Sequence, residues 1–177
     1  MRILGIDPGL GTTGYGAIEY RRGEYLLVEG GIVQTESSTP LPERLAKLYR
    51  GIETVVRQLQ PDVAVVERLY AKYRHPQTAL LMSHARGVVL LALAHTYVDV
   101  VSYPASLVKR ALVGHGRASK DQVAGMVAQL LHIDVGGLTD DVTDALALAI
   151  CHATPWARAS AAAAGDEVAE MLKRGRK

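Results

Sequence analysis

Acidic residues stand at three points in the sequence where a predicted strand ends or a predicted helix begins. The four residues are Asp7, Glu67, Asp141 and Asp144. Asp7 and Glu67 each end a short apolar, strand-like run, whereas Asp141 and Asp144 open an apolar helix and share one of its faces, being three residues apart. If the two strands are neighbours, all these carboxylates converge at one edge of the sheet. Like charges that converge in this way are costly without a cation.

The four carboxylates make up an all-oxygen ligand set, which hard divalent cations such as Mg²⁺ or Mn²⁺ prefer. Two ions would suit this set best, at a separation of about 3.5 to 4 Å; one helps to generate hydroxide from water and the other stabilises the departing oxygen of a phosphodiester. The set therefore predicts nuclease chemistry. Asp140 is left out of it, because we expect helical spacing to turn its side chain away from that of Asp144.

Each acidic position also has a structural interpretation when it is taken alone. Asp7 precedes Pro8-Gly9, and an aspartate at such a place commonly bonds to the backbone of a turn. Asp140 or Asp141 would cap a helix and interact favourably with its dipole. These alternatives stay open for the single residues, whereas the three positions together favour one site.

The glycines that follow Asp7 match the pattern GxGxxG over residues 9–14. In a dinucleotide-binding fold this pattern opens a helix, but residues 15–20 alternate like a strand. No lysine of the phosphate-loop type follows the glycines. We therefore reject a nucleotide site here and expect the glycines to shape a turn.

The spacing of apolar residues predicts one α/β domain. Strands are expected over residues 2–6, 14–20, 24–34, 62–67 and 99–103, and helices over 41–59, 77–97, from 104 onward, 119–131 and 140–152. Short turns should make the first three strands antiparallel, whereas the strand–helix–strand units that follow favour parallel pairing. The expected fold is a mixed five-stranded sheet flanked by helices, over residues 1–155, with a low-complexity, basic tail over 156–177.

Charge and composition narrow the class of protein further. The net charge of the 177 residues is +2, but residues 68–120 contain eight basic residues and one acidic residue. Such a segment is expected of a nucleic-acid surface, although helices also carry solvated lysine and arginine for solubility alone. The single cysteine excludes an internal disulfide. No apolar run reaches the roughly 18 to 20 residues of a membrane span, and no secretory signal opens the chain, so we expect a cytoplasmic protein without a membrane partner.

Several segments, in this order, resemble the RuvC-type Holliday junction resolvases. They are residues 5–16, 66–72, 85–88, 108–123 and 141–149. The resemblance extends to about residue 152. It implies a ribonuclease H-like fold, a homodimer with two active sites, and cooperation with a branch-migration motor.

The resemblance also assigns roles to single residues. The acidic tetrad of the family falls on the four carboxylates above, and Lys120 falls on a basic position implicated in catalysis. Tyr70 falls where the family tends to place an aromatic residue that stacks on an unpaired base, which contributes about 1 to 3 kcal/mol. The remaining residues expected to contact DNA are Lys72, Arg74, Lys109, Arg110 and Arg117.

The sequence thus predicts a structure-specific, divalent-metal-dependent endodeoxyribonuclease. The resemblance implies that it resolves four-way DNA junctions, in recombination and repair, by symmetric nicks in two opposed strands that leave 5′-phosphate ends. The alternative from another class is a junction-binding module without catalysis, which the complete set of carboxylates argues against. An ATP-handling relative would need a second lobe, for which 177 residues leave no room.

Overall fold

A five-stranded mixed sheet forms the centre of the computed structural model, which describes residues 1–69 and 76–164. Its order is β3-β2-β1-β4-β5, in which β1, β2 and β3 are antiparallel and β1, β4 and β5 are parallel. The strands are β1 (Arg2–Asp7), β2 (Thr12–Arg21), β3 (Glu24–Gln34), β4 (Val63–Glu67) and β5 (Asp99–Tyr103). The predicted sheet, with its antiparallel and parallel parts, is confirmed.

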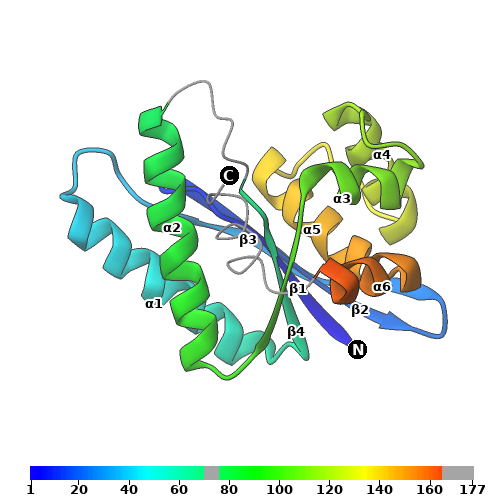
Figure 1. Ribbon diagram of the computed structural model, residues 1–177, viewed down its shortest axis with the longest axis horizontal. Coiled ribbons are helices and arrows are strands. Elements are labelled where there is room, and N and C mark those ends of the chain that lie inside the picture. The colour runs from blue at the N-terminus through cyan, green and yellow to red at the C-terminus, as the bar shows by residue number, and fades with distance from the viewer. Residues whose placement is uncertain (70–75, 165–177) are drawn as a thin grey trace.

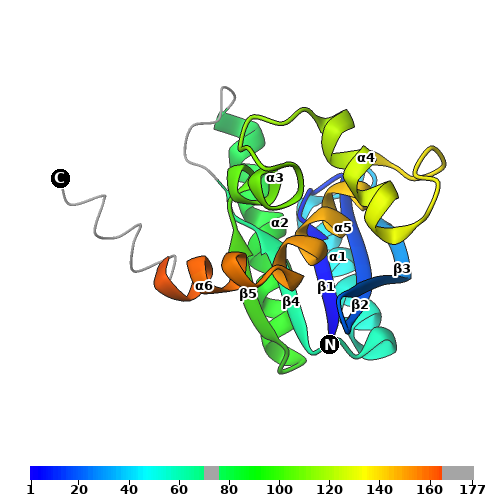
Figure 2. The ribbon, with the colours of Figure 1, turned by 90° about the vertical axis from the view of Figure 1, so that its right-hand side faces the viewer.

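Helices cover both faces of this sheet, so the domain has three layers (Figure 1). One face carries α1 (Leu41–Leu59) and α2 (Pro76–His95). The other face carries α3 (Ala105–Val113), α4 (Lys120–Leu131), α5 (Asp140–Ala153) and α6 (Pro155–Ala164). Figure 2 shows α5 lying along β1 and β2, the strands against which it makes most of its contacts.

Side chains of the central strands point alternately to the two faces of the sheet, and this divides the hydrophobic core into two clusters. Leu4 and Ile6 of β1 pack with the residues of α1 and α2, whereas Ile3 packs toward α5. Because successive side chains of a strand point to opposite faces, Asp7 belongs to the face that Ile3 shares with α5. Glu67 follows Val65 in the same way, and Val65 belongs to the cluster that includes α5. Both carboxylates are therefore aimed at the layer that contains Asp141 and Asp144.

Glycines in β1 and β2 allow α5 to lie directly on the sheet. A side chain at Gly5 would overlap the backbone oxygen of Ala145, and one at Gly14 would overlap the backbone of Asp141. Gly9 lies in the connection between the strands, as predicted, but Gly14 lies within β2. The strand predicted over residues 14–20 already included Gly14, and this glycine does not shape a turn but brings the first turn of α5 close to Asp7.

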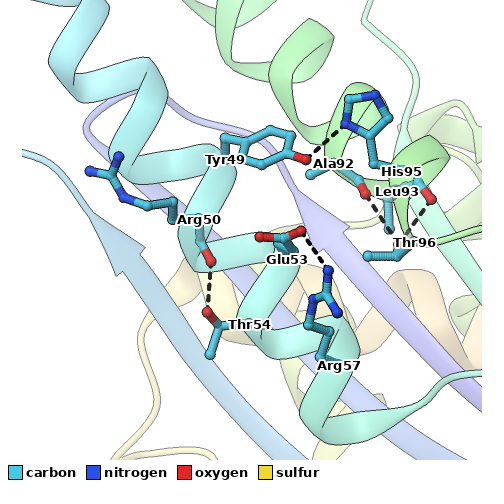
Figure 3. A network of polar contacts seen from close by, with 9 residues as sticks. All are labelled: Tyr49, Arg50, Glu53, Thr54, Arg57, Ala92, Leu93, His95 and Thr96. Carbon is cyan, nitrogen blue, oxygen red and sulfur yellow. Dashed lines mark hydrogen bonds and ion pairs between the residues drawn. The ribbon is translucent and has the colours of Figure 1, made fainter.

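Polar contacts join the two helices of the other layer, α1 and α2, near the end of α2 (Figure 3). The hydroxyl of Tyr49 on α1 is hydrogen-bonded to Nδ1 of His95 on α2, at 2.8 Å. The hydroxyl of Thr96 donates to the carbonyl oxygens of Ala92 and Leu93 and so closes the last turn of α2. These bonds end α2 at His95, two residues before the predicted end.

Helix α2 is the one element, among the described residues, that is long and apolar enough to cross a membrane by length and composition. The segment 77–95 has a mean hydropathy of 1.3, but it contains Ser83, His84 and Arg86 and so is not an uninterrupted apolar run. A single such helix is weak evidence for a span. Ala85, Val89 and Leu93 are buried in the domain core, so one face of α2 is committed to packing.

Helix α6 occupies the first part of the segment that the sequence predicted to be a tail. Ala157 is fully buried in the core, and the Arg158 guanidinium donates to the carbonyl oxygens of His152 and Ala153 at the end of α5. The run of alanines favours a helix, and the arginine satisfies carbonyls that the end of α5 leaves unpaired. The ordered fold therefore continues past residue 155, and residues 165–177 lie outside the described part.

A buried histidine predicts how stability will respond to acid. His152 is 7% exposed, and its Nδ1 is hydrogen-bonded to the hydroxyl of the fully buried Tyr103 at 2.8 Å. Burial, and then the charge of Arg158, lower the pKa of His152 to about 4. In the unfolded chain the His152 imidazole binds a proton near pH 6.5, whereas in the folded chain it stays neutral down to about pH 4. The free energy of unfolding should therefore fall as the pH drops from about 7 to about 4.

Urea unfolding at pH 7.5 and pH 5 would measure this loss. In His152→Gln we expect the difference between the two pH values to shrink. The exposed His115 offers the matched control, and His115→Gln should keep the wild-type difference. An equal pH difference in wild type and His152→Gln would contradict the assignment.

Candidate active site

Two carboxylates lie side by side where β1 and β4 end. The two strands are parallel neighbours with Ile6 opposite Val66, so the next residues, Asp7 and Glu67, emerge at the same edge. They lie close enough for the charge of Glu67 to add to burial in raising the pKa of Asp7. This confirms the prediction that both strand ends deliver an acidic group to one place.

The first turn of α5 completes the acidic cluster. Asp7 pairs with Gly14 across the sheet, and Gly14 in turn abuts Asp141. Burial and the neighbouring negative charges of Glu67, Asp144 and Asp141 raise the pKa of Asp7 well above its usual range. Since all three other carboxylates act on Asp7, the structure brings the predicted set of four together.

A cavity of about 350 Å³ opens beside the cluster. Asp7, Glu67 and Asp144 provide its acidic lining, and Lys109 and Lys120 provide its basic lining. The rest of the lining is apolar and comes from Met82, Ala105, Val108, Val123, Ala147 and Leu148. Low-polarity walls around a few charged groups strengthen the electrostatic interactions within such a cavity.

Lys120 reaches the cluster from the first residue of α4. Its Nζ lies 3.1 Å from Oδ2 of Asp144 and 3.5 Å from Oδ2 of Asp140. The position is fixed by a capping box, in which Ser119 and Gln122 satisfy each other's backbone N–H groups. The expectation that Asp140 would turn away from Asp144 is wrong, because residues four apart are neighbours on a helix.

Comparison with known proteins agrees with this geometry. Residues 3–152 match the family described as "Crossover junction endodeoxyribonuclease RuvC". The chain belongs to the RuvC family. The protein of that name from Ralstonia nicotianae is 44% identical over 86% of this chain and 83% of its own length. The one from Moorella thermoacetica is 42% identical over 93% and 99%.

A solved structure of a RuvC protein superposes on nearly the whole chain. It is described as "T. thermophilus RuvC in complex with Holliday junction substrate", with a TM-score of 0.84 and 32% identity over 91% of this chain and 98% of that one. The expected ribonuclease H-like fold is thereby confirmed, as is the nuclease class. The yeast mitochondrial resolvase Ydc2 shares the fold, with a TM-score of 0.64 at 15% identity.

Divalent-metal dependence goes with the RuvC family, and the donor set here fits it. The four carboxylates supply only oxygen, and their mutual repulsion is relieved by a cation. Within residues 1–69 and 76–164, no group of three or more acidic, histidine or cysteine side chains is already arranged to hold a metal ion. Asp144 pairs with Lys120, so a cation that binds Asp144 must replace this contact.

The residues expected to bind DNA are distributed unevenly around this RuvC site. Lys109 lines the cavity, and its charge, like that of Lys120, opposes the rise in the pKa of Glu67 that burial causes. Arg110 on α3 and Arg117 between α3 and α4 are exposed and lie outside the cavity lining. The predictions for Tyr70, Lys72 and Arg74 fall outside the described residues.

Arg86 is a residue of the site for which the sequence analysis gave no role. From α2 its Nε donates to the carbonyl oxygen of Glu67, and its Nη2 donates to the hydroxyl of Ser102 on β5, both at 3.0 Å. The guanidinium thus ties together the ends of β4 and β5 and fixes the backbone that carries Glu67. The sequence did contain a signal for this role, namely a single arginine within an otherwise apolar helix.

Proposed function

We propose that this RuvC-family protein is a structure-specific endonuclease that resolves four-way DNA junctions by nicking two opposed strands. The main support for this proposal is that four carboxylates and one lysine converge beside one cavity: Asp7, Glu67, Asp141, Asp144 and Lys120. That arrangement combines oxygen ligands for cations with a cationic group for a phosphate. It supports hydrolysis of a phosphodiester to a 5′-phosphate and a 3′-hydroxyl.

We infer that the bound cations are Mg²⁺ or Mn²⁺, two per site. Such ions supply activation of water and stabilisation of the departing oxygen. Asp7 lies between Glu67 on β4 and Asp144 on α5. Asp7 would hold the cations, and Glu67 and Asp144 would be the ligands on either side of it. Lys120 would stabilise the negative charge that develops on the phosphate in the transition state.

Basic residues around the cavity fit a junction whose arms leave the site along α3 and the connection to α4. Lys109 would lie near the cleaved strand, whereas the exposed Arg110 and Arg117 would hold flanking phosphates. Base stacking by Tyr70, and DNA contacts by Lys72 and Arg74, stay predictions. The branch-migration motor and the cytoplasmic location stay predictions as well.

A homodimer is part of this proposal, because two opposed cuts in a junction with two-fold symmetry call for a two-fold enzyme. The outer face of α2 offers an interface. Leu80, Leu81 and Leu91 are 62%, 42% and 49% exposed there, and Gly87 between them leaves room for close approach. An apolar stripe of this kind on a folded domain is typical of a protein–protein contact.

Charged substitutions on this stripe should break the dimer. We expect light scattering to give the dimer mass for the wild type and the monomer mass for Leu80→Glu/Leu91→Glu at micromolar concentration. Leu26→Glu is the matched control, because Leu26 is 51% exposed on β3, far from α2, and this variant should stay dimeric. A monomeric wild type, with or without junction DNA, would refute the dimer; a dimeric double variant would refute this interface.

The test of the function is cleavage of a labelled synthetic four-way junction beside a linear duplex of matched sequence. With Mg²⁺ or Mn²⁺ we expect paired nicks in opposed strands of the junction and none in the duplex, and none with excess chelator. Full junction cleavage in chelator would refute the metal-dependent mechanism. Tight junction binding without cleavage in either metal would favour a non-catalytic binding module instead.

A further inference from the structure

Lys120 is shared between two carboxylates that differ in their surroundings. Asp144 lines the cavity and its side chain is 34% exposed, whereas Asp140 lies one turn earlier on α5, outside the lining, and is 80% exposed. Nζ of Lys120 lies between them, 3.1 Å from Asp144 and 3.5 Å from Asp140. A small movement of the flexible lysine side chain would transfer it from one carboxylate to the other.

Two positive charges compete for Asp144. The proposed function assigns its carboxylate to a divalent cation, but in the structure the Lys120 ammonium occupies Oδ2. An ammonium and a divalent ion repel each other at one oxygen, so the cation can bind there only when the lysine moves away. Without another anchor, a lysine displaced in this way would extend into solvent and leave the phosphate that it serves.

We propose that Asp140 is a positioning residue, which takes over the Lys120 ammonium when Asp144 takes up the cation and so keeps the lysine beside the reacting phosphate. This inference rests on the proposed function. Asp140 suits the role because it is within reach of the same Nζ and stands apart from the cavity. It need not contact the metal or the DNA.

Metal binding without DNA provides the first test. In calorimetric titrations with Mn²⁺ alone, we expect Asp140→Asn to weaken binding about three-fold, because exposed ion pairs are worth up to about 1 kcal/mol and the lysine would then remain on Asp144. Lys120→Met should bind Mn²⁺ more tightly than the wild type. In the Lys120→Met background, Asp140→Asn should have no further effect.

This double-mutant cycle separates positioning from simple electrostatics, since loss of any nearby negative charge could weaken cation binding. If Asp140 acted only through its charge, Asp140→Asn would weaken binding equally in both backgrounds, and the proposal would be overturned. Asp121→Asn is the matched control: it removes an exposed charge from the first turn of α4 and should leave Mn²⁺ affinity at the wild-type value. Wild-type affinity in Asp140→Asn, or a wild type that binds no Mn²⁺, would also overturn it.

Cleavage provides the second readout. In Asp140→Asn the metal concentration for half-maximal junction cleavage should rise about three-fold, by the same weakening of metal binding, while junction affinity measured in Ca²⁺ stays unchanged. Absence of junction cleavage in the wild type would refute the proposed function. The DNA-free cycle would still decide the role of Asp140, so the two failures are distinguishable.

Discussion

Replacing Asp7 with asparagine should slow junction cleavage severely and preserve junction binding. Asp7 is the residue on which all the other carboxylates act, so its loss removes the ligand at the centre of the set. Metal stabilisation of a transition state is worth several kcal/mol, and each 1.4 kcal/mol is about a factor of ten, so we expect a rate loss on the order of 1000-fold. Single-turnover cleavage with saturating Mg²⁺ would measure it.

The fold of this variant is expected to be intact. Asparagine has the shape of aspartate but no charge, so it removes the cost of burying a carboxylate beside other carboxylates, and burial followed by those charges is what raises the pKa of Asp7 in the metal-free protein. In chelator at neutral pH, Asp7→Asn should therefore be at least as stable to urea as the wild type. A variant that is both inactive and clearly less stable would show damage to the fold instead of loss of a ligand.

Asp99→Asn is the matched control for cleavage. Asp99 is an exposed aspartate at the start of β5, whereas the active site lies where the parallel strands end. The control should cleave at the wild-type rate. Junction cleavage within ten-fold of wild type by Asp7→Asn would contradict the central role of Asp7, and equal loss in Asp99→Asn would show that the assay reports net charge.

The strand-end carboxylates could be predicted because the relevant rules are local. A short apolar run followed by an acid and Pro-Gly defines the end of β1 at Asp7, and the run before Glu67 defines the end of β4. Parallel pairing then places both acids at one edge. Which strands are neighbours is a long-range property, and only the structure, with Ile6 opposite Val66, establishes it.

The parts of the site that the sequence analysis missed depend on contacts between distant elements. Lys120 and Asp140 are 20 residues apart on different helices, and their contact follows from the packing of α4 beside α5. Arg86 on α2 reaches the backbone of Glu67 on β4 across 19 residues of sequence. The proximity of Asp140 to Asp144, in contrast, follows from ordinary helical spacing and could have been predicted.

The close approach of α5 to the sheet leads to a second large expected effect, in Gly14→Ala. The added methyl group would overlap the backbone of Asp141, which cannot move without displacing the first turn of α5. Overpacking of this kind costs about 1 to 3 kcal/mol of stability. Displacement of a catalytic group by about 1 Å can cost on the order of 100-fold in rate. We therefore expect lower stability and about 100-fold slower cleavage.

Thermal unfolding and single-turnover cleavage at saturating Mg²⁺ would separate the two effects, since the cleavage can be measured well below the unfolding temperature. Gly125→Ala is the matched control: Gly125 is exposed within α4 and has open space around it, so alanine there should add about 0.5 to 1 kcal/mol of stability and leave cleavage unchanged. Wild-type cleavage by a folded Gly14→Ala protein would show that α5 can move outward without disturbing the carboxylates. The position of Asp141 would then be set by the cations and the DNA, and not by the contact between helix and sheet.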